Sequence, residues 1–527
     1  MHMYDLIIRN GYIIDGSGNP GFHADVAVKD GRIAAIARPI LAAAAKEIDA
    51  RGHVVAPGFI DSHSHDDIIL ESMPDMKHKL EQGITGEIVG MCGFSCAPVS
   101  DRNKAEGLKA LKSLMSQGSP ADNTHNRLYS DYVRRVEAIP TGPHFYGLIG
   151  HNIIRLAVMG TENREPTAAE LEEMKAYVKD AMEAGALGIS LGMHYTPGFF
   201  AKTDELIALC EVAAAYGGIM TLHMRYEDGN LLEGVRETIE IVRATGIKTV
   251  ISHHKVIGTP AVWGLTEQSL QMIDEAIAEG LDIYLDQYPY TAVSSTLVSN
   301  LPHEYLSQGT EKVLAALADP AERKKIKDLL LADRPAEDFF FGRLIGASPT
   351  HPELNNTRIL EYAAEHDMDP YDLYFDVMLW DELETSTIAF LMSDEDVDRV
   401  MKHPRTMIGT DGLYYPGCAS CHPRATASFP RVLGHFVRAR HTLDLVDAIR
   451  KMTGLPAMVY QLPGKGLLRA GMDADIVIFD PDTIIDAAGF NNCFEKTPGL
   501  DYVLVGGEIA VKDAEYLGVL NGRFHTR

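Results

Sequence analysis

The stretch TAAELEEMKAYVKDAMEAGALGISLG, residues 167–192, combines a helix with a strand. Thr167 is a residue type that caps helix N-termini, and Leu171, Met174 and Val178 fall at helical spacing on one face. Gly185 is the expected end of the helix, and the apolar run ALGISL follows it directly. A helix that alternates with a short apolar strand is the repeating unit of α/β folds with parallel strands.

The same alternation extends over most of the chain, where eight apolar runs of strand length are followed in most cases by helical segments. The runs are Val54 to Ile60, Ile84 to Val89, Phe145 to Ile149, Ala186 to Leu191, Ile219 to Leu222, Thr249 to Ile251, Leu281 to Leu285 and Met407 to Ile408. This pattern predicts an α/β fold with a (β/α)8 TIM-like barrel. A long segment, roughly residues 291–405, separates the seventh and eighth runs. Because a plain loop of that length is improbable, this segment predicts an inserted subdomain that could cover the barrel mouth.

Short β-rich segments bracket the chain. Strand-like runs near the start are punctuated by Gly11, Gly16 and the turn Asp30-Gly31, which is hairpin chemistry. Runs of the same character occur near the end, with Gly506-Gly507 as a turn. We therefore expect residues 1–56 and 461–527 to form one small β-sandwich module, with residues 57–460 as the barrel.

Composition excludes several classes of partner. The 527 residues are 46% hydrophobic and 23% charged, as in globular proteins, and the formal net charge is −26. Such a charge argues against nucleic acid or an anionic membrane as partner.

No apolar stretch is long enough to span a bilayer, and the opening residues MHMYDLIIRNGYIIDG read as strand and turn. Six cysteines in a chain of this length do not make a disulfide framework, so a reducing cytoplasm is the expected location.

Metal-binding residue types follow five of the predicted strands. In a barrel of this type, active-site residues lie at the C-terminal ends of the strands. The residues found there are His63 and His65 after the first strand, Cys92 after the second, His223 after the fifth, His253 after the sixth and Asp411 after the eighth. Any one of them alone is better explained as a packed or capping residue. Together they predict a metal site, and imidazole, thiolate and carboxylate suit zinc better than calcium or magnesium.

These motifs resemble the amidohydrolase superfamily. Many of its members bridge two metals with a carboxylated lysine on strand four, but GALGISLG contains no lysine. The cysteine in GMCGFSCAP resembles instead the D-aminoacylases (N-acyl-D-amino-acid deacylases), in which a thiolate takes the bridging role. The resemblance implies a tight zinc site at Cys92, His223 and His253. It also implies a second, weaker site at His63, His65 and Asp411.

The same resemblance implies a set of substrate contacts. The matching motifs are GMHYTPG, SHHK, YPYTAVSST and HPR. They place Tyr195, Lys255, Tyr288, Ser294 and Arg424 at the substrate, with Arg424 as bidentate partner of its carboxylate. Their structural alternatives are packing aromatics, a turn serine and solvated surface charges.

The implied reaction is zinc-dependent hydrolysis of a small N-acyl-D-amino acid to a carboxylate and the free D-amino acid. Asp411 is the expected general base and then acid. One alternative is a cyclic amidohydrolase such as a hydantoinase or dihydroorotase. The other is a non-catalytic assembly protein derived from an amidohydrolase. Side-chain preference, the number of working metals and the oligomeric state stay open at this level.

The loop between Asp411 and Arg424 departs from the family pattern, because it is slightly longer and contains Cys418-x-x-Cys421-His422. This is the spacing of a c-type haem attachment or a redox pair. Haem is rejected, because no export signal is seen and the loop is expected over the barrel mouth. Incidental thiols, a redox pair and an additional metal remain as interpretations.

Overall fold

Helix α5 (Ala168–Glu183) and strand β10 (Gly188–Gly192) confirm the helix-strand unit predicted from residues 167–192. The computed structural model describes residues 3–103, 105, 125–414 and 421–527. Thr167 and Glu170 form a capping box, in which the Glu170 amide donates to the Thr167 side chain and the Thr167 amide to the Glu170 carboxylate. Met174 and Val178 are buried on the inner face of α5, whereas Leu171 is half-buried. Gly185 follows at φ +90°, a backbone conformation that favours glycine.

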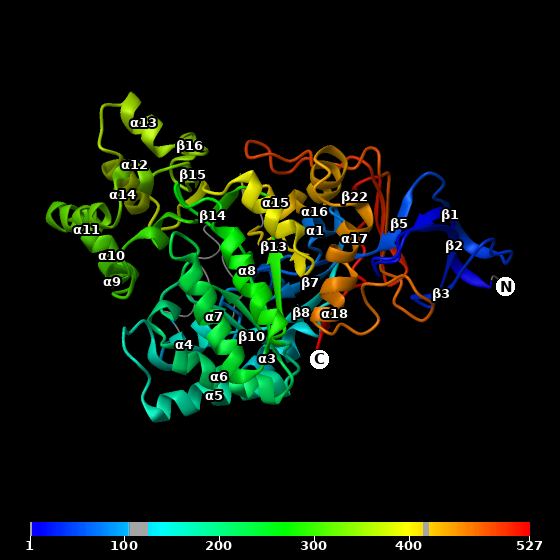
Figure 1. The fold of residues 1–527 in the computed structure, drawn as a ribbon, viewed down its shortest axis with the longest axis horizontal. Helices are drawn as coiled ribbons and strands as arrows, with labels where there is room; N and C mark the ends of the chain where they lie inside the picture. The colour runs from blue at the N-terminus through cyan, green and yellow to red at the C-terminus, as the bar shows by residue number, and fades with distance from the viewer. Residues whose placement is uncertain (1–2, 104, 106–124, 415–420) are drawn as a thin grey trace.

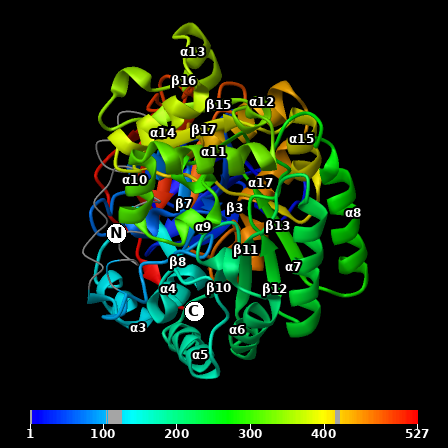
Figure 2. The same cartoon turned by 90° about the vertical axis from the view of Figure 1, so that its left-hand side faces the viewer.

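The parallel strands lie in two sheets. One sheet has the order β18-β13-β12-β11-β10-β9, and the other has the order β23-β8-β7-β6. Their bounds are Phe59–Asp61 (β6), Ile84–Val89 (β7), His144–Gly147 (β8), Ile149–Gly150 (β9), Gly188–Gly192 (β10), Ile219–His223 (β11), Lys248–Ile251 (β12), Ile283–Gln287 (β13), Thr406–Ile408 (β18) and Phe524–His525 (β23). In Figure 2, helices α5, α6 (Thr203–Ala215), α7 (Leu231–Thr245) and α8 (Leu265–Ala278) lie in an arc outside strands β10 to β13.

Hydrogen bonds join the two parallel sheets at two places, between β7 and the residue before β9 and between the residue after β6 and β18. Leu148 N donates to Val89 O at 3.0 Å, and Ser62 N donates to Ile408 O at 3.2 Å. A parallel bridge between Ser64 and Gly412 continues the second junction. As a result, the C-terminal ends of β6 and β18, which are far apart in sequence, lie side by side.

The first predicted strand was wrong in one respect, because Val54 to Ile60 is not one strand. Val54–Pro57 (β5) pairs with the terminal strands β1 (Tyr4–Ile13) and β19 (Ile476–Phe479), whereas β6 pairs with β7. Gly58 separates the two, and its amide donates to Asp475 O. A Cβ at Gly58 would lie 2.1 Å from Thr85 Oγ1, so only glycine fits at this crossing.

Strands from both ends of the chain form one nine-stranded sheet in the order β22-β21-β20-β19-β5-β1-β2-β3, with β4 paired to β1. The remaining bounds are Phe22–Lys29 (β2), Arg32–Ala37 (β3), Ala44–Asp49 (β4), Leu500–Val505 (β20), Glu508–Lys512 (β21) and Glu515–Tyr516 (β22). Pairing of the two termini was predicted, and β5 against β19 is where they meet. Figure 1 shows β1 to β3 at one end of the molecule, far from the long insertion.

The segment between β13 and β18 holds a sheet and a core of its own. Its antiparallel sheet has the order β14-β17-β15-β16, with bounds Ala292–Thr296 (β14), Arg343–Ala347 (β15), Thr357–Arg358 (β16) and Ser386–Phe390 (β17). The predicted helix DPAERKKIKDLLLAD is α11 (Pro320–Asp333), capped by Asp319. Helices α9 (His303–Leu306) to α14 (Pro370–Trp380) stand out at the opposite end of the molecule from β1 (Figure 1). Within the described ranges, no helix combines the length and apolar character needed to cross a bilayer.

Candidate metal centre

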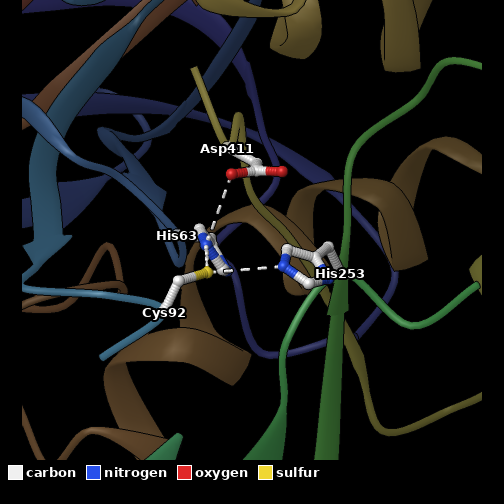
Figure 3. Close-up of side chains that lie close together, drawn as sticks. All are labelled: His63, Cys92, His253 and Asp411. Carbon is white, nitrogen blue, oxygen red and sulfur yellow. Dashed lines mark hydrogen bonds and ion pairs between the residues drawn. The ribbon is translucent and has the colours of Figure 1, made fainter. Parts of the chain in front are cut away.

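The predicted metal-binding side chains gather at the C-terminal ends of the parallel strands. Single donor atoms of His63, Cys92, His253 and Asp411 lie within 4.8 Å of one another. Cys92 Sγ lies 3.3 Å from His63 Nε2 and 3.4 Å from His253 Nε2. Figure 3 draws both contacts as dashed lines. Asp411 faces the same space from the end of β18. Strands of one parallel set place their C-terminal ends at one edge, which brings these residues together.

The other two predicted ligands flank this group. His65 Nε2 lies 3.3 Å from Asp411 Oδ1, and the His223 ring centre lies 4.3 Å from that of His253. All six side chains are buried. We refer to His63, His65, Cys92, His223, His253 and Asp411 as the donor cluster.

The backbone is strained where several of these side chains begin. Cys92, His253 and Asp411 have φ values of +52°, +36° and +46°, a region that non-glycine residues rarely occupy. The strained residues are held by hydrogen bonds, from Asp411 N to His63 O at 2.9 Å and from His253 N to Asp286 Oδ1 at 2.7 Å. The surrounding fold therefore imposes the direction in which the donors point.

Close packing of the donors shifts the pKa values of the cluster in the direction opposite to that expected from burial. Burial alone would raise the pKa of the Cys92 thiol, but His63 and His253 lower it well below its usual value. Burial would lower the pKa of His65, yet the hydrogen bond to Asp411 raises it to about 9. The pKa of His223 is likewise raised to about 9 against burial, through Glu227. The cluster thus favours the thiolate form of Cys92.

The donor set fits zinc. Two ligand atoms of a tetrahedral zinc ion, with bonds of about 2.0–2.3 Å, are roughly 3.3–3.8 Å apart. The distances from Cys92 Sγ to His63 Nε2, 3.3 Å, and to His253 Nε2, 3.4 Å, agree with this spacing. The buried Nδ1 atoms of His65 and His223 have no hydrogen-bond partner among the described residues, so each histidine has a nitrogen to spare. A ligand set of thiolate and imidazole binds zinc in preference to calcium or magnesium.

Two carboxylates that support the cluster were missed by the sequence analysis. Asp286 lies 3.1 Å from His63 Nδ1, which leaves Nε2 of that ring facing Cys92. Supporting carboxylates of this kind fix the orientation of histidine ligands. Asp286 lies near the C-terminal end of β13, where the reasoning that selected Asp411 would also have selected it.

Glu227 is the second missed carboxylate. Its Oε2 lies 3.3 Å from His223 Nε2 and 2.6 Å from Lys255 Nζ, and its Oε1 lies 3.1 Å from His253 Nδ1. Glu227, His223 and His253 form a second group of close donors. The sequence signal was an acid four residues after His223, beyond the strand end where ligands were sought.

The predicted substrate residues all line one cleft of about 1220 Å³ that also reaches His223, His253 and Asp411. They are Tyr195, Lys255, Tyr288, Ser294 and Arg424. Lys255 and Arg424 are buried, not solvated surface charges. Arg424 Nη1 lies 2.7 Å from Asp411 Oδ2, and its guanidinium lies 4.6 Å from the Tyr288 ring centre. A second cleft of about 640 Å³ meets the donor cluster at His65 and Cys92.

Comparison with known proteins shows to which family the chain belongs. The Amidohydrolase family pattern matches residues 46–511. A D-aminoacylase from Alcaligenes xylosoxydans xylosoxydans is 36% identical over 99% of this chain and 98% of its own length. The chain belongs to the D-aminoacylase group of the amidohydrolase family. An N-acyl-D-glutamate deacylase of the same organism is 37% identical over 95% of this chain and 93% of its own length.

Solved structures of the group agree with this membership. An N-acyl-D-glutamate deacylase from Bordetella bronchiseptica, complexed with zinc and a phosphonate inhibitor, matches with a TM-score of 0.83 and 34% identity, over 99% of both chains. A D-aminoacylase crystal structure matches equally well, over 99% of this chain and 100% of that one. A D-hydantoinase reaches a TM-score of only 0.54 at 15% identity, over 99% of both chains, which is a likeness of fold alone.

The cysteine motif in the loop after Asp411 is described only in part. Cys418 lies outside the described residues. Cys421 is buried, and its amide donates to Cys493 Sγ at 3.1 Å. His422 is also buried, and its Nε2 lies 3.1 Å from Ala292 O, so this edge of the ring faces the insertion's sheet.

Proposed function

We propose that this chain is a zinc-dependent hydrolase of N-acyl-D-amino acids, releasing a carboxylate and the free D-amino acid. The observation that carries the proposal is the joining of a thiolate-containing donor cluster to a cleft that is lined by the buried cations Lys255 and Arg424. Similarity over nearly the full length to a D-aminoacylase, an N-acyl-D-glutamate deacylase and an N-acyl-D-aspartate deacylase supports it. The substrate is accordingly a small molecule with an α-carboxylate.

Cys92, His223 and His253 are the residues that would hold the tighter zinc, and His63, His65 and Asp411 the second, weaker one. When bound, zinc supplies Lewis-acid chemistry, which polarises the scissile carbonyl and lowers the pKa of the attacking water. His63 and His253 keep Cys92 as a thiolate, and Asp286 holds the His63 ring in place.

Asp411 is the proposed general base and then general acid. Burial would raise its pKa, but Arg424 and His63 lower it well below its usual value, so the carboxylate is ionised at neutral pH. It accepts the proton of the attacking water and delivers it to the leaving amine. Arg424 is bonded to Asp411 through Nη1, and its Nε has no hydrogen-bond partner among the described residues.

Arg424 and the Tyr288 hydroxyl are proposed to bind the substrate carboxylate. The buried Tyr288 hydroxyl lines the cleft and lacks a partner in the described part of the chain. Lys255 Nζ donates to Glu227 Oε2 at 2.6 Å and to His253 O at 3.2 Å, so two of its three N–H donors are occupied. The third is left for the substrate, while Tyr195 and Ser294 bound the cleft. Two-point attachment of the carboxylate fixes which face of the α-carbon meets the metal, which selects the D enantiomer.

We also infer that the eight strand positions form a closed (β/α)8 barrel, capped by a β-sandwich at the termini. The hydrogen bonds that link β7 to Leu148 and Ser62 to β18 support closure. A core shared by Leu6, Val26, Ile476 and Leu504, from strands of both chain ends, supports one module built from the two termini. The proposed division stays the same: residues 1–56 and 461–527 form the β-sandwich module, and residues 57–460 form the barrel.

The test is release of free amino acid from matched N-acetyl-D and N-acetyl-L forms of methionine, leucine and glutamate, with zinc added. Turnover confined to the D series is expected, and its rates give the side-chain preference. If folded, zinc-loaded protein turns over neither enantiomer, the proposal is wrong. Opening of a hydantoin ring by that protein would then identify a cyclic amidohydrolase.

A further inference from the structure

One wall of the cleft is a face of the insertion's sheet. Val293, Ala389 and Arg343 are directly opposite one another across β14, β17 and β15, so their side chains point to the same side. Ser295 and Thr387 form the next row on that side. Val293, Ser295, Thr387 and Arg343 all line the cleft. Ala292, Leu344 and Ile388 form a small core on the opposite face.

Arg343 differs from the other buried cations of this cleft. Lys255 pairs with Glu227 and Arg424 with Asp411. Arg343 is 8% exposed and, among the described residues, has no carboxylate oxygen within 4.0 Å. Its Nε donates to Phe339 O at 3.3 Å, and its guanidinium lies 5.4 Å from the Phe339 ring centre. Asp333, which also lines the cleft, is already paired with Arg334.

A buried cation without a counter-charge is costly. Burial lowers the pKa of Arg343 to about 10, and the group still carries its charge at neutral pH. The cost is offset when an anion enters the cleft and makes charge-assisted hydrogen bonds to the guanidinium. Residues 293, 295 and 387 supply no competing charge on this wall.

The register of the sheet places Arg343 relative to the reaction site. Neighbouring strands are about 4.8 Å apart, so the Cα of Arg343 lies roughly 10 Å from that of Val293, across β17. The next residue, Ser294, accepts a hydrogen bond from Arg424 Nη2 through its carbonyl oxygen at 3.4 Å. Arg343 therefore lies beyond the proposed α-carboxylate position, along the same wall.

We propose that Arg343 binds a second carboxylate of the substrate, distinct from the α-carboxylate held at Arg424. The inference rests on the proposed deacylase function and narrows its substrate class to dicarboxylic N-acyl-D-amino acids. The second carboxylate belongs either to the side chain of an acidic D-amino acid or to a dicarboxylic acyl group. Both sources present the same chemistry to the guanidinium.

Two substrate pairs separate these sources, each matched in size and differing by one charge. N-acetyl-D-glutamate is compared with N-acetyl-D-glutamine, and N-succinyl-D-leucine with its terminal amide, N-succinamoyl-D-leucine. We expect the wild type to favour the charged member of one pair in kcat/KM by about 10- to 100-fold, the value of a hydrogen-bonded charge. The pair that shows this preference identifies the source.

Arg343→Met is expected to abolish the preference, and Arg343→Lys to retain part of it. Lys202→Met is the matched control, because Lys202 is an exposed cation of the same cleft, and the preference should persist in that variant. The inference is overturned if the wild type shows no preference in either pair, or if Arg343→Met keeps it. If no D-substrate is hydrolysed at all, the proposed function fails instead. Calorimetric titration of wild type and Arg343→Met with glutarate then tests the anion site alone, and equal affinities would overturn it.

Discussion

At the scale of single residues, the direction of a side chain is set by the backbone that carries it. Cys92, His253 and Asp411 adopt positive φ, where asparagine and aspartate are tolerated better than most residues. An asparagine at position 411 keeps both the backbone conformation and the size of the side chain. The change from Asp411 to asparagine therefore separates chemistry from folding.

Asp411→Asn is expected to lower kcat by about 10²- to 10⁴-fold, the usual contribution of a general base. The zinc held by Cys92, His223 and His253 should remain, as measured by metal content per chain beside steady-state kinetics. Asp367→Asn is the control, because Asp367 is an exposed residue at φ +53° and its variant should be fully active. Wild-type turnover by Asp411→Asn would exclude the base assignment.

Glu227→Gln is expected to weaken zinc binding by about 10- to 100-fold, as loss of a carboxylate that supports histidine ligands does. The variant keeps the shape of the side chain but removes the charge that faces His223, His253 and Lys255. Zinc affinity is measured by competition with a chelator. Glu237→Gln, which removes a carboxylate paired with Arg225 in the same cleft, should bind zinc normally. Unchanged affinity in Glu227→Gln would show that Glu227 only neutralises Lys255.

At the scale of elements, buried charges join helices to the strands that carry the site. Helix α17 (Leu445–Met452) directs Lys451 inward, where its Nζ donates to the carbonyl oxygens of His403 and Thr406 just before and at the start of β18. Burial lowers the pKa of Lys451 from 10.5 to about 8. In the unfolded chain the amine returns to its ordinary value.

The free energy of unfolding should consequently rise with pH between about 8 and 10.5, because in that window the unfolded chain binds more protons at Lys451 than the folded chain. Below pH 8 both states are protonated and this contribution is constant. The rise is at most about 3 kcal/mol, and Lys451→Met should remove it. Denaturant unfolding at pH 7.5, 9 and 10.5 measures the difference from wild type. Lys402→Met, at an exposed lysine, should retain the wild-type rise, and an identical rise in Lys451→Met would refute the linkage.

At the scale of the whole molecule, the C-terminus returns to the parallel strands. Strand β23 pairs with β8, and the ring of Phe524 packs edge-on against Tyr132 at 5.7 Å. Phe524 is buried, although it belongs to the last residues of the chain. The terminal segment thus closes the β8 edge of the sheet that contains β6 and β7.

Phe524→Ala is expected to cost about 3–5 kcal/mol of stability, as is usual for a buried aromatic side chain. The loss should appear as a lower Tm in thermal unfolding. Leu520→Ala, at a residue that is 41% exposed, should change stability by no more than about 0.5 kcal/mol. Equal effects of the two changes would mean that β23 contributes little to the fold.

The sequence by itself determined the helix-strand alternation and the residue types at the strand ends, because periodicity and capping are local properties. All six residues of the donor cluster were located in this way. Only the tertiary structure decided which carboxylates and cations lie against these six residues. Asp286 holds His63 across 223 residues of sequence, and Asp411 is paired with Arg424. Among the described residues, no carboxylate pairs with Arg343, which lies on a strand of the insertion at the cleft wall. Such pairings depend on strand register and on the division at Gly58, which no local pattern encodes.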